Sequence, residues 1–167
     1  ALDNLNMRRI RKIYSRQAVV IRSGVDVEKF KGNCRDDIRQ WHGLIKEDFV
    51  LLQVGALTHY KRQIDSLRAL KSLGKRDHVK LMLIGSGNER DELKKLAHEF
   101  NIEKRVVFVD SVEESDLPKY YAACDVLIFP SEQTWGLAAV EAMASSKPVI
   151  ASMASGVSEI IEHGATG

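Results

Sequence analysis

The stretch FVLLQVGALTHYKRQIDSLRALKSL, residues 49–73, contains the unit on which the predicted fold is built. Residues 49–54 form an apolar run with the length of a buried strand, and Gly55 ends it. From Arg62 to Leu73, isoleucine and leucine recur at every third residue, which indicates a helix with one buried face. A strand followed directly by a helix is the repeating unit of a parallel sheet.

The same alternation continues to the end of the chain. Further strands are expected at residues 80–84, 106–109, 125–129 and 148–151. Further helices are expected at about 88–100, 116–123, 136–145 and 157–162. The first thirty residues are expected to hold a helix through about Tyr14 and a strand at residues 18–21. The pattern predicts a Rossmann-like α/β fold, with a doubly wound, mostly parallel sheet and helices on both faces.

Composition and charge limit the function classes. Apolar residues make up 44% of the 167 and charged residues 29%, which is typical of one soluble globular domain. The net charge is only +2, so nucleic-acid binding would need local clustering, and we expect none. The one basic cluster, residues 8–12, is interpreted as a solvated helix face, with a membrane-surface or phosphate role as the alternative.

The two cysteines and the apolar runs bear on location. Cys34 and Cys124 lack the spacing of zinc or redox sites, which favours a reducing compartment, and Cys124 is expected to face the core. No apolar run approaches the length of a transmembrane helix. We therefore expect a cytoplasmic protein, with the inner face of the membrane as a further option.

Ligands of doubly wound sheets collect beyond the carboxyl ends of the strands, so the loops that follow the strands are the candidate sites. Gly85-Ser86-Gly87 resembles a dinucleotide-binding turn, but Arg90 stands where the third glycine of that motif belongs. This turn is therefore interpreted as a tight connection that lets a helix pack closely on the sheet.

The loop at residues 55–62 carries two adjacent cations where a strand ends and a helix begins. Lys61 and Arg62 could converge with backbone N–H groups on an anion, although solvated loop lysines remain the alternative. His59 alone does not indicate catalysis. The other four histidines, at positions 42, 78, 98 and 163, are expected to be solvated.

The stretch QTWGLAAVE, residues 133–141, places a glycine and a carboxylate at the start of a helix. Gly136 would let the backbone approach a ligand, and the first N–H groups of the helix suit a diphosphate. The side chain of Glu141 leans back toward that helix start, where its carboxylate could accept from two ribose hydroxyls. An exposed helix glutamate is the alternative interpretation.

Five stretches in this order match a known family. They are VIRSGVD at 20–26 with Phe30, VGALTHYK at 54–61, LIGSG at 83–87, VVFVDSV at 106–112 followed by Leu117, Tyr121 and Asp125, and the segments FPS, WGL, EAMA and KPVIAS between 129 and 152. The chain resembles the C-terminal, donor-binding domain of the retaining family-four (group 1) glycosyltransferases, which have a two-Rossmann-domain architecture.

The resemblance implies a reaction and a role for several residues. The reaction is transfer of a sugar from a UDP-, GDP- or ADP-sugar to an acceptor hydroxyl with retained anomeric configuration, and no metal or other cofactor is expected. Lys61 would grip the donor diphosphate and Glu141 would hold the nucleotide ribose. Gly136 and Leu137 would offer backbone N–H groups, and the backbone at Val112 would meet the base.

Two departures from the family pattern put ordinary activity in doubt. Gln133 stands where the family has a glutamate, and the adjacent Glu132 is the candidate substitute. Ala56 stands where the family has an arginine, and Arg62 is the candidate substitute. These departures keep open a non-catalytic nucleotide- or partner-binding domain with a degenerate site. The predicted catalytic residues are Lys61, Gln133 and Glu141, and the predicted nucleotide-sugar-binding residues are Gly55, Lys61, Arg62, Val112, Glu132, Gln133, Gly136, Leu137 and Glu141.

The resemblance also implies that residues 1–167 are one nucleotide-sugar-binding domain of a longer protein. The N-terminal acceptor domain and the last C-terminal elements of the family would lie outside them. The acceptor, a saccharide or a lipid-linked sugar in polysaccharide biosynthesis, would bind to that other domain. The chain is therefore expected to bind a donor without turning it over alone.

Overall fold

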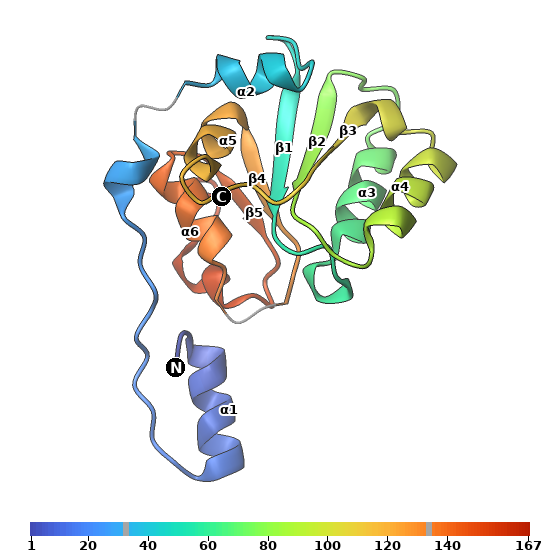
Figure 1. The fold of residues 1–167 in the computed structure, drawn as a ribbon. Helices are drawn as coiled ribbons and strands as arrows, with labels where there is room; N and C mark the ends of the chain where they lie inside the picture. The colour runs from blue at the N-terminus through green and yellow to red at the C-terminus, as the bar shows by residue number, and fades with distance from the viewer. Residues whose placement is uncertain (32–33, 133–134) are drawn as a thin grey trace.

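The computed structural model describes residues 1–31, 34–132 and 135–167, and these contain a five-stranded parallel sheet with helices on both faces (Figure 1). The strands are β1 (Phe49–Val54), β2 (Val79–Ile84), β3 (Val106–Val109), β4 (Val126–Phe129) and β5 (Val149–Ala151). Their order is β3-β2-β1-β4-β5, and all four pairings are parallel. The predicted doubly wound α/β fold is confirmed.

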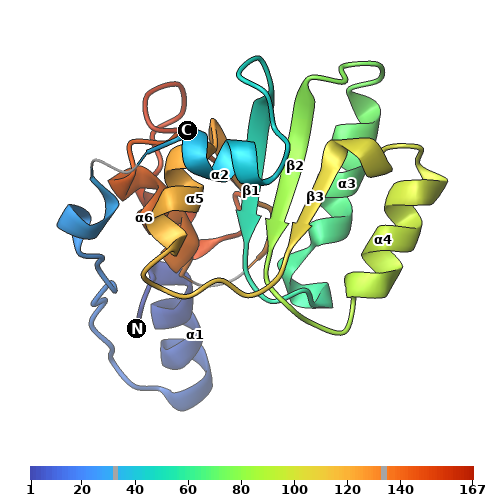
Figure 2. The same cartoon turned by 45° about the horizontal axis from the view of Figure 1, so that its top comes forward.

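Helices α3 and α4 cover one face of this sheet, and α5 and α6 cover the other (Figures 1 and 2). One apolar cluster joins Leu81 and Leu83 of β2 to the leucines of α3 and α4, and the other joins Leu52 of β1 to α5 and α6. The α-helices are α1 (Asn4–Tyr14), α2 (Asp36–Trp41), α3 (Gln63–Ser72), α4 (Arg90–Glu99), α5 (Leu117–Ala123) and α6 (Leu137–Ala144). The 3-10 helices are η1 (Val27–Phe30), η2 (His59–Lys61), η3 (Glu103–Arg105) and η4 (Gly156–Ile160).

Three expectations about secondary structure are corrected. Residues 18–21 form no strand of the sheet; they lie against the first residue, where Ala1 N donates to Val19 O and Ile21 N donates to Ala1 O, both at 2.8 Å. Helix α2 was not predicted, because six residues show too little apolar periodicity. The last predicted helix is a 3-10 helix, η4.

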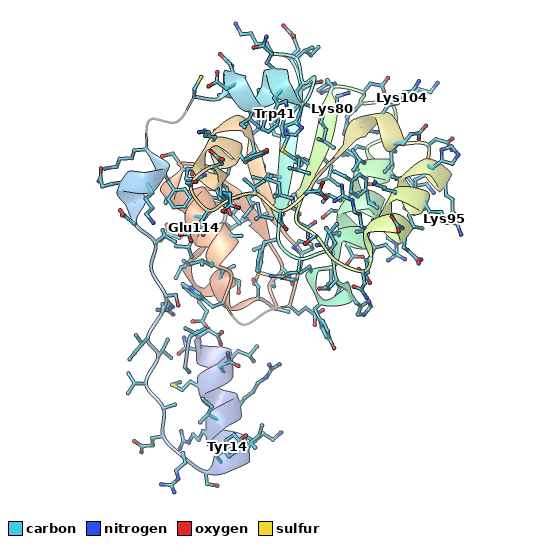
Figure 3. The ribbon with its side chains drawn as sticks, in the orientation of Figure 1. Tyr14, Trp41, Lys80, Lys95, Lys104 and Glu114 are labelled. Atoms are coloured by element: carbon cyan, nitrogen blue, oxygen red, sulfur yellow. The ribbon has the colours of Figure 1, made fainter. Side chains whose placement is uncertain are left out.

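Helix α1 stands away from the sheet, and Tyr14 lies at its far end (Figure 3). Its amino end is capped by Asp3, whose side chain accepts from Asn6 N at 2.7 Å. Arg8, Arg9, Arg11 and Lys12 are all exposed, which fits both a solvated helix face and a surface that meets a membrane or a phosphate. Among residues 1–31, 34–132 and 135–167, no helix is long and apolar enough to cross a membrane.

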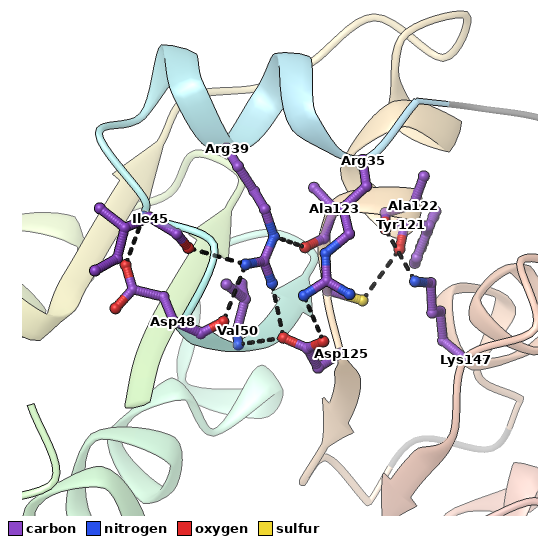
Figure 4. A network of polar contacts seen from close by, with 11 residues as sticks. Arg35, Arg39, Ile45, Asp48, Val50, Tyr121, Ala122, Ala123, Asp125 and Lys147 are labelled. Atoms are coloured by element: carbon purple, nitrogen blue, oxygen red, sulfur yellow. Dashed lines mark hydrogen bonds and ion pairs between the residues drawn. The ribbon is translucent and has the colours of Figure 1, made fainter. Parts of the chain in front are cut away.

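The carboxylate of Asp125, just before β4, ties together the amino ends of two strands and helix α2 (Figure 4). Its Oδ2 accepts from Val50 N and from Arg39 Nη2, both at 2.7 Å, and Arg35 Nη2 lies 2.8 Å from Oδ1. Arg39 is only 3% exposed and also donates to the carbonyls of Ala123, Ile45 and Asp48. This network holds α2 against the starts of β1 and β4.

Replacing Asp125 by asparagine should unfold the protein more easily. The change keeps the shape of the side chain but leaves the buried Arg39 guanidinium without its counter-charge, and breaking a buried ion pair costs about 3–5 kcal/mol. Urea denaturation should show a fall of about 3 kcal/mol in the free energy of unfolding. The control is Asp36→Asn at the exposed first residue of α2, for which we expect a change within about 0.5 kcal/mol. Equal effects of the two changes would contradict the assigned role.

Candidate functional site

The loops that follow β1 and β4 meet at the carboxyl edge of the sheet. Leu52 of β1 pairs with Leu127 of β4, so the two strands end at the same level. Beyond them, Arg62 Nη1 lies 2.6 Å from Glu132 Oε1 and joins the two loops directly. The structure thus brings the lysine-bearing loop predicted from the sequence next to the loop that opens α6.

Lys61 is half-buried, and its side chain lies over Gly55. Gly55 has φ +145°, and a Cβ built there would be 3.2 Å from Lys61 Cε, so the chain path needs glycine at this point. Two hydrogen bonds in series hold the backbone of Lys61. Gln53 Nε2 donates to the Lys61 carbonyl at 2.8 Å, and Ser66 Oγ donates to Gln53 Oε1 at 2.7 Å. Burial lowers the pKa of the Lys61 ammonium. An anion bound here would meet a partly desolvated, well-positioned cation.

Arg62 adopts a backbone conformation that is unusual for an arginine. Its φ of +57° and ψ of +37° are left-handed, at the residue that precedes α3. Its Nε lies 2.6 Å from Asp65 Oδ2, in addition to the contact with Glu132. The hydrogen bond and charge of Asp65, followed by the charge of Glu132, raise the pKa of Arg62. Arg62 therefore lies at the site, but a diphosphate would compete with two carboxylates for it.

Glu141 of α6 is half-buried and already accepts one hydrogen bond. The hydroxyl of Tyr121 donates to Glu141 Oε2 at 2.6 Å, whereas Oε1 has no donor in the part of the chain that the structure describes. Burial, followed by the charge of Glu141, raises the pKa of Tyr121 far above its ordinary value. The carboxylate is thus held through one oxygen, and the other is available to a ligand.

The start of α6 combines unpaired N–H groups with a packing constraint. Within the described residues, the N–H groups of Gly136, Leu137 and Ala138 have no acceptor, as expected for a first helical turn. Gly136 is buried, and a Cβ built there would lie 2.7 Å from Phe129 Cζ. The glycine is therefore explained first by the aromatic ring beneath it, a reason that the sequence did not reveal.

Two buried polar atoms near the edge were missed from the sequence. Ser131 Oγ and Gln63 Oε1 have no hydrogen-bond partner among residues 1–31, 34–132 and 135–167, and each residue is only 1% exposed. Ser131 directly precedes Glu132, and Gln63 opens α3 directly after Arg62. Buried polar atoms without partners are rare in proteins, which distinguishes these two side chains from the others in the two loops. The Pro130-Ser131 pair that stops β4 was the available signal for the first of them.

The loops after β2 and β3 form the continuation of the same edge. Gly85 has φ +138°, and a Cβ built there would be 2.3 Å from Gly55 O, which confirms that this turn is a tight backbone connection. Ser86 Oγ lies 3.0 Å from Ser111 Oγ and joins the two loops. Val112 packs against the apolar cluster under α5 and α6. Val112, the residue predicted to contact the base, thus lies in a loop at the carboxyl edge of the sheet.

Gln133, the third predicted catalytic residue, lies outside the described residues. Its neighbour Glu132 is exposed and lines two clefts of about 520 and 540 Å³. The first cleft contains Tyr60 and Arg68, and the second lies between α1 and η4. No group of three or more His, Cys, Asp or Glu side chains in residues 1–31, 34–132 and 135–167 is arranged to hold a metal ion.

A further cleft of about 620 Å³ lies between α2, α5 and the loop after β3, and it includes Val112, the residue predicted to meet the base. It is lined by Trp41, His42, Tyr120 and Val112 among others. His42 stacks on Trp41 with ring centroids 5.4 Å apart, and burial lowers its pKa. The expectation of a solvated side chain is therefore wrong for His42, and it is confirmed for the histidines at 78, 98 and 163.

Replacing Gly136 by alanine should destabilise the protein through the Phe129 ring. The added methyl group would lie within 3 Å of ring carbons, and overpacking of this kind costs about 1–3 kcal/mol. The control is Gly24→Ala, where no atom lies within 4 Å and φ is not left-handed, so stability should not fall. Urea denaturation of both variants checks this, and Phe129→Leu should relieve the loss in Gly136→Ala. Equal stability of the two alanine variants would refute the packing role.

The chain is similar to known proteins in both sequence and structure. The family model described as "Glycosyl transferases group 1" matches residues 35–167. An uncharacterised glycosyltransferase of Methanocaldococcus jannaschii is 33% identical over 153 residues, which are 89% of this chain and 39% of that protein. The D-inositol 3-phosphate glycosyltransferase of Mycobacterium marinum is 35% identical over 154 residues, 89% of this chain and 32% of that protein.

Among solved structures, Anabaena HepE in complex with UDP-glucose has a TM-score of 0.89 and 29% sequence identity. The match covers 100% of this chain and 48% of that one. The chain thus spans less than half the length of each protein compared with it.

Proposed function

The chain belongs to the group 1 glycosyltransferases, and we propose that it binds a nucleotide diphosphate sugar for retaining transfer of the sugar to an acceptor hydroxyl. The observation that carries this proposal is the meeting of two loops at the carboxyl edge of the sheet. The contact between Arg62 and Glu132 brings the loop of Lys61 beside the start of α6. The structural likeness to HepE, which was solved with UDP-glucose, supports the same conclusion.

The diphosphate would be bound by Lys61 and by the start of α6. A partly desolvated ammonium interacts more strongly with an anion than a solvated one does, and unpaired N–H groups at a helix start favour negative charge. As the bond between sugar and diphosphate breaks, charge builds up on the leaving diphosphate, and groups already in place stabilise it without reorganising. In this proposal side-chain and backbone donors meet that charge, and no metal ion is assigned to the site.

Glu141 would hold the nucleotide ribose, and the backbone at Val112 would meet the base. A carboxylate accepts hydrogen bonds from hydroxyl groups, and Glu141 Oε1 is available for one. Gln133 and Glu132 would face the sugar itself, where Gln133 can form hydrogen bonds without adding negative charge. Gly55, Arg62, Gly136 and Leu137 complete the proposed binding set.

The proposal places the acceptor on a part of the protein beyond these residues. The relatives compared are more than twice as long as the match, which supports a further domain that binds a saccharide or lipid-linked sugar. The chain alone would then bind the donor without transferring sugar. The same proposal assigns the complete protein to glycan synthesis in the cytoplasm, with peripheral contact to the membrane.

One observation favours a second candidate, a nucleotide- or partner-binding domain without catalysis. Ala56 offers no cation at the position where the family that the sequence resembles has an arginine. The Ala56 carbonyl accepts a hydrogen bond from Gln63 Nε2 at 2.9 Å. Arg62, the candidate replacement, is engaged with Asp65 and Glu132. The first candidate requires nucleotide sugars to bind at this edge, whereas the second, as a partner-binding domain, does not.

Titration calorimetry of the chain with UDP, GDP, ADP and their sugars separates these candidates. One nucleoside diphosphate should bind saturably, and Lys61→Ala should weaken it about 10-fold or more, because a hydrogen bond to a charged group contributes about 1.5–3 kcal/mol. Glu141→Ala should also weaken it. Lys75→Ala removes an exposed lysine between α3 and β2 and should leave affinity unchanged. A folded chain that binds none of these ligands would favour the second candidate.

Nucleotide affinity should fall with rising pH earlier than an ordinary lysine would allow. Burial lowers the pKa of Lys61 below its ordinary 10.5, so the ammonium loses its proton, and with it the attraction to a diphosphate, as pH rises through that lowered value. Lys61→Arg should keep its affinity over the same range, because arginine stays charged. Ionisation of the nucleotide itself affects both proteins equally. Parallel pH profiles for the two proteins would exclude Lys61 as the titrating group.

A further inference from the structure

Glu141 reaches the proposed donor site already bonded to a buried tyrosine. We propose that Tyr121 is a positioning residue that fixes which oxygen of Glu141 meets the ribose, and so sets how strongly the site selects ribose over deoxyribose. This inference rests on the proposed function, since it concerns the carboxylate assigned to the nucleotide.

The contact between the two side chains is short and charge-assisted. The Tyr121 hydroxyl donates to Glu141 Oε2 at 2.6 Å, and the tyrosine ring is fully buried. Hydrogen bonds from hydroxyl groups to carboxylates are short and about twice as strong as neutral ones. The buried Tyr121 hydroxyl cannot donate to bulk water, so Glu141 is its acceptor in the folded chain.

Tyr121 itself has little freedom to move. Its ring packs edge-to-face on Phe30 of η1, with centroids 5.8 Å apart and an angle of 64° between the planes. Its carbonyl accepts from Cys124 N at 3.3 Å and from Cys124 Sγ at 3.2 Å. The aromatic side chain also has only two rotatable bonds. The hydroxyl is therefore a fixed point to which the flexible glutamate is tied.

The hydroxyl acts as a hydrogen-bond donor and not as an acid. Burial and the neighbouring carboxylate raise the pKa of Tyr121 far above its ordinary value, so the proton stays on the phenol oxygen. Glu141 Oε2 is then occupied by this donor, and Oε1 is left for a ribose hydroxyl. A second ribose hydroxyl would have to share Oε2 with the tyrosine.

This arrangement removes a cost of binding. A free glutamate must be ordered when a ligand binds, and ordering a side chain of this kind reduces affinity by about 2- to 10-fold. In this chain the ordering is done during folding, by Tyr121. The benefit reaches only those ligands that hydrogen-bond to the carboxylate, which distinguishes positioning from a general contribution to stability.

The test compares two adjacent tyrosines and two nucleotides. Tyr121→Phe removes the hydroxyl that holds Glu141. Tyr120→Phe is the matched control, because it removes a hydroxyl from the same helix whose nearest polar partner is His42 Nε2, at 3.4 Å. Affinities of the chain for UDP and for 2′,3′-dideoxy-UDP are measured by calorimetry, with unfolding midpoints recorded for each variant.

Tyr121→Phe should weaken UDP about 2- to 10-fold and leave the dideoxy nucleotide unchanged, so that ribose selection falls by the same factor. Tyr120→Phe should change neither affinity. Equal weakening of both nucleotides by Tyr121→Phe, or no weakening of UDP, would overturn the positioning role. If the unmodified chain binds neither UDP, GDP nor ADP, the proposed function fails and this inference falls with it. If the chain binds UDP and Glu141→Ala weakens it, but Tyr121→Phe does not, only this inference fails.

Discussion

The carboxylate of Asp125 is the constraint on which the arrangement of the site depends. It accepts from Val50 N at 2.7 Å, while Asp125 N donates to Val50 O at 2.8 Å, so the chain is fastened to β1 directly before β4 begins. Fixing the amino ends of two parallel strands also fixes where their carboxyl ends lie. Here β1 and β4 end side by side, because Leu52 pairs with Leu127 and each strand ends two residues later. The buried Arg39 holds Asp125 from the other side. The meeting of the two loops at the opposite edge of the sheet is a consequence of this register.

At that edge, the groups assigned to the ligand are restrained before any ligand arrives. Gln53 fixes the backbone of Lys61, and Tyr121 fixes the carboxylate of Glu141. Arg62 is fixed as well, but by two carboxylates that a diphosphate would have to replace. The site therefore combines two groups that other side chains hold in position with an arginine that must exchange its carboxylate partners for a ligand. Such prior ordering lowers the cost of association and gives directional selectivity to groups that would otherwise be flexible.

The sequence predicted the sheet well, because apolar runs and helical periodicity report burial directly. It also placed Lys61 in the loop after β1 and Glu141 in the helix after β4, the two strands whose following loops meet at one edge. It failed where only tertiary contacts decide: residues 18–21 are apolar yet lie outside the sheet, and Gly136 is required by a ring that lies seven residues before it. The Tyr121 contact spans 20 residues and leaves no local pattern. The spacing of apolar residues likewise does not predict the left-handed backbone conformation of Arg62.

The most direct test of the account uses the two tryptophans of the chain. Trp135 lies beside the start of α6, where its Nε1 donates to Ser23 O at 3.0 Å, and Trp41 lies beside His42 in the cleft that also includes Val112. Their indole N–H signals can be followed in a nitrogen–proton NMR spectrum during titration with UDP. A donor site at the carboxyl edge predicts that the Trp135 signal and the amides of residues 55–62 and 136–141 shift together, along with the amide of Val112, which the proposal assigns to the base. Shifts confined to Trp41 and its neighbours would contradict the account.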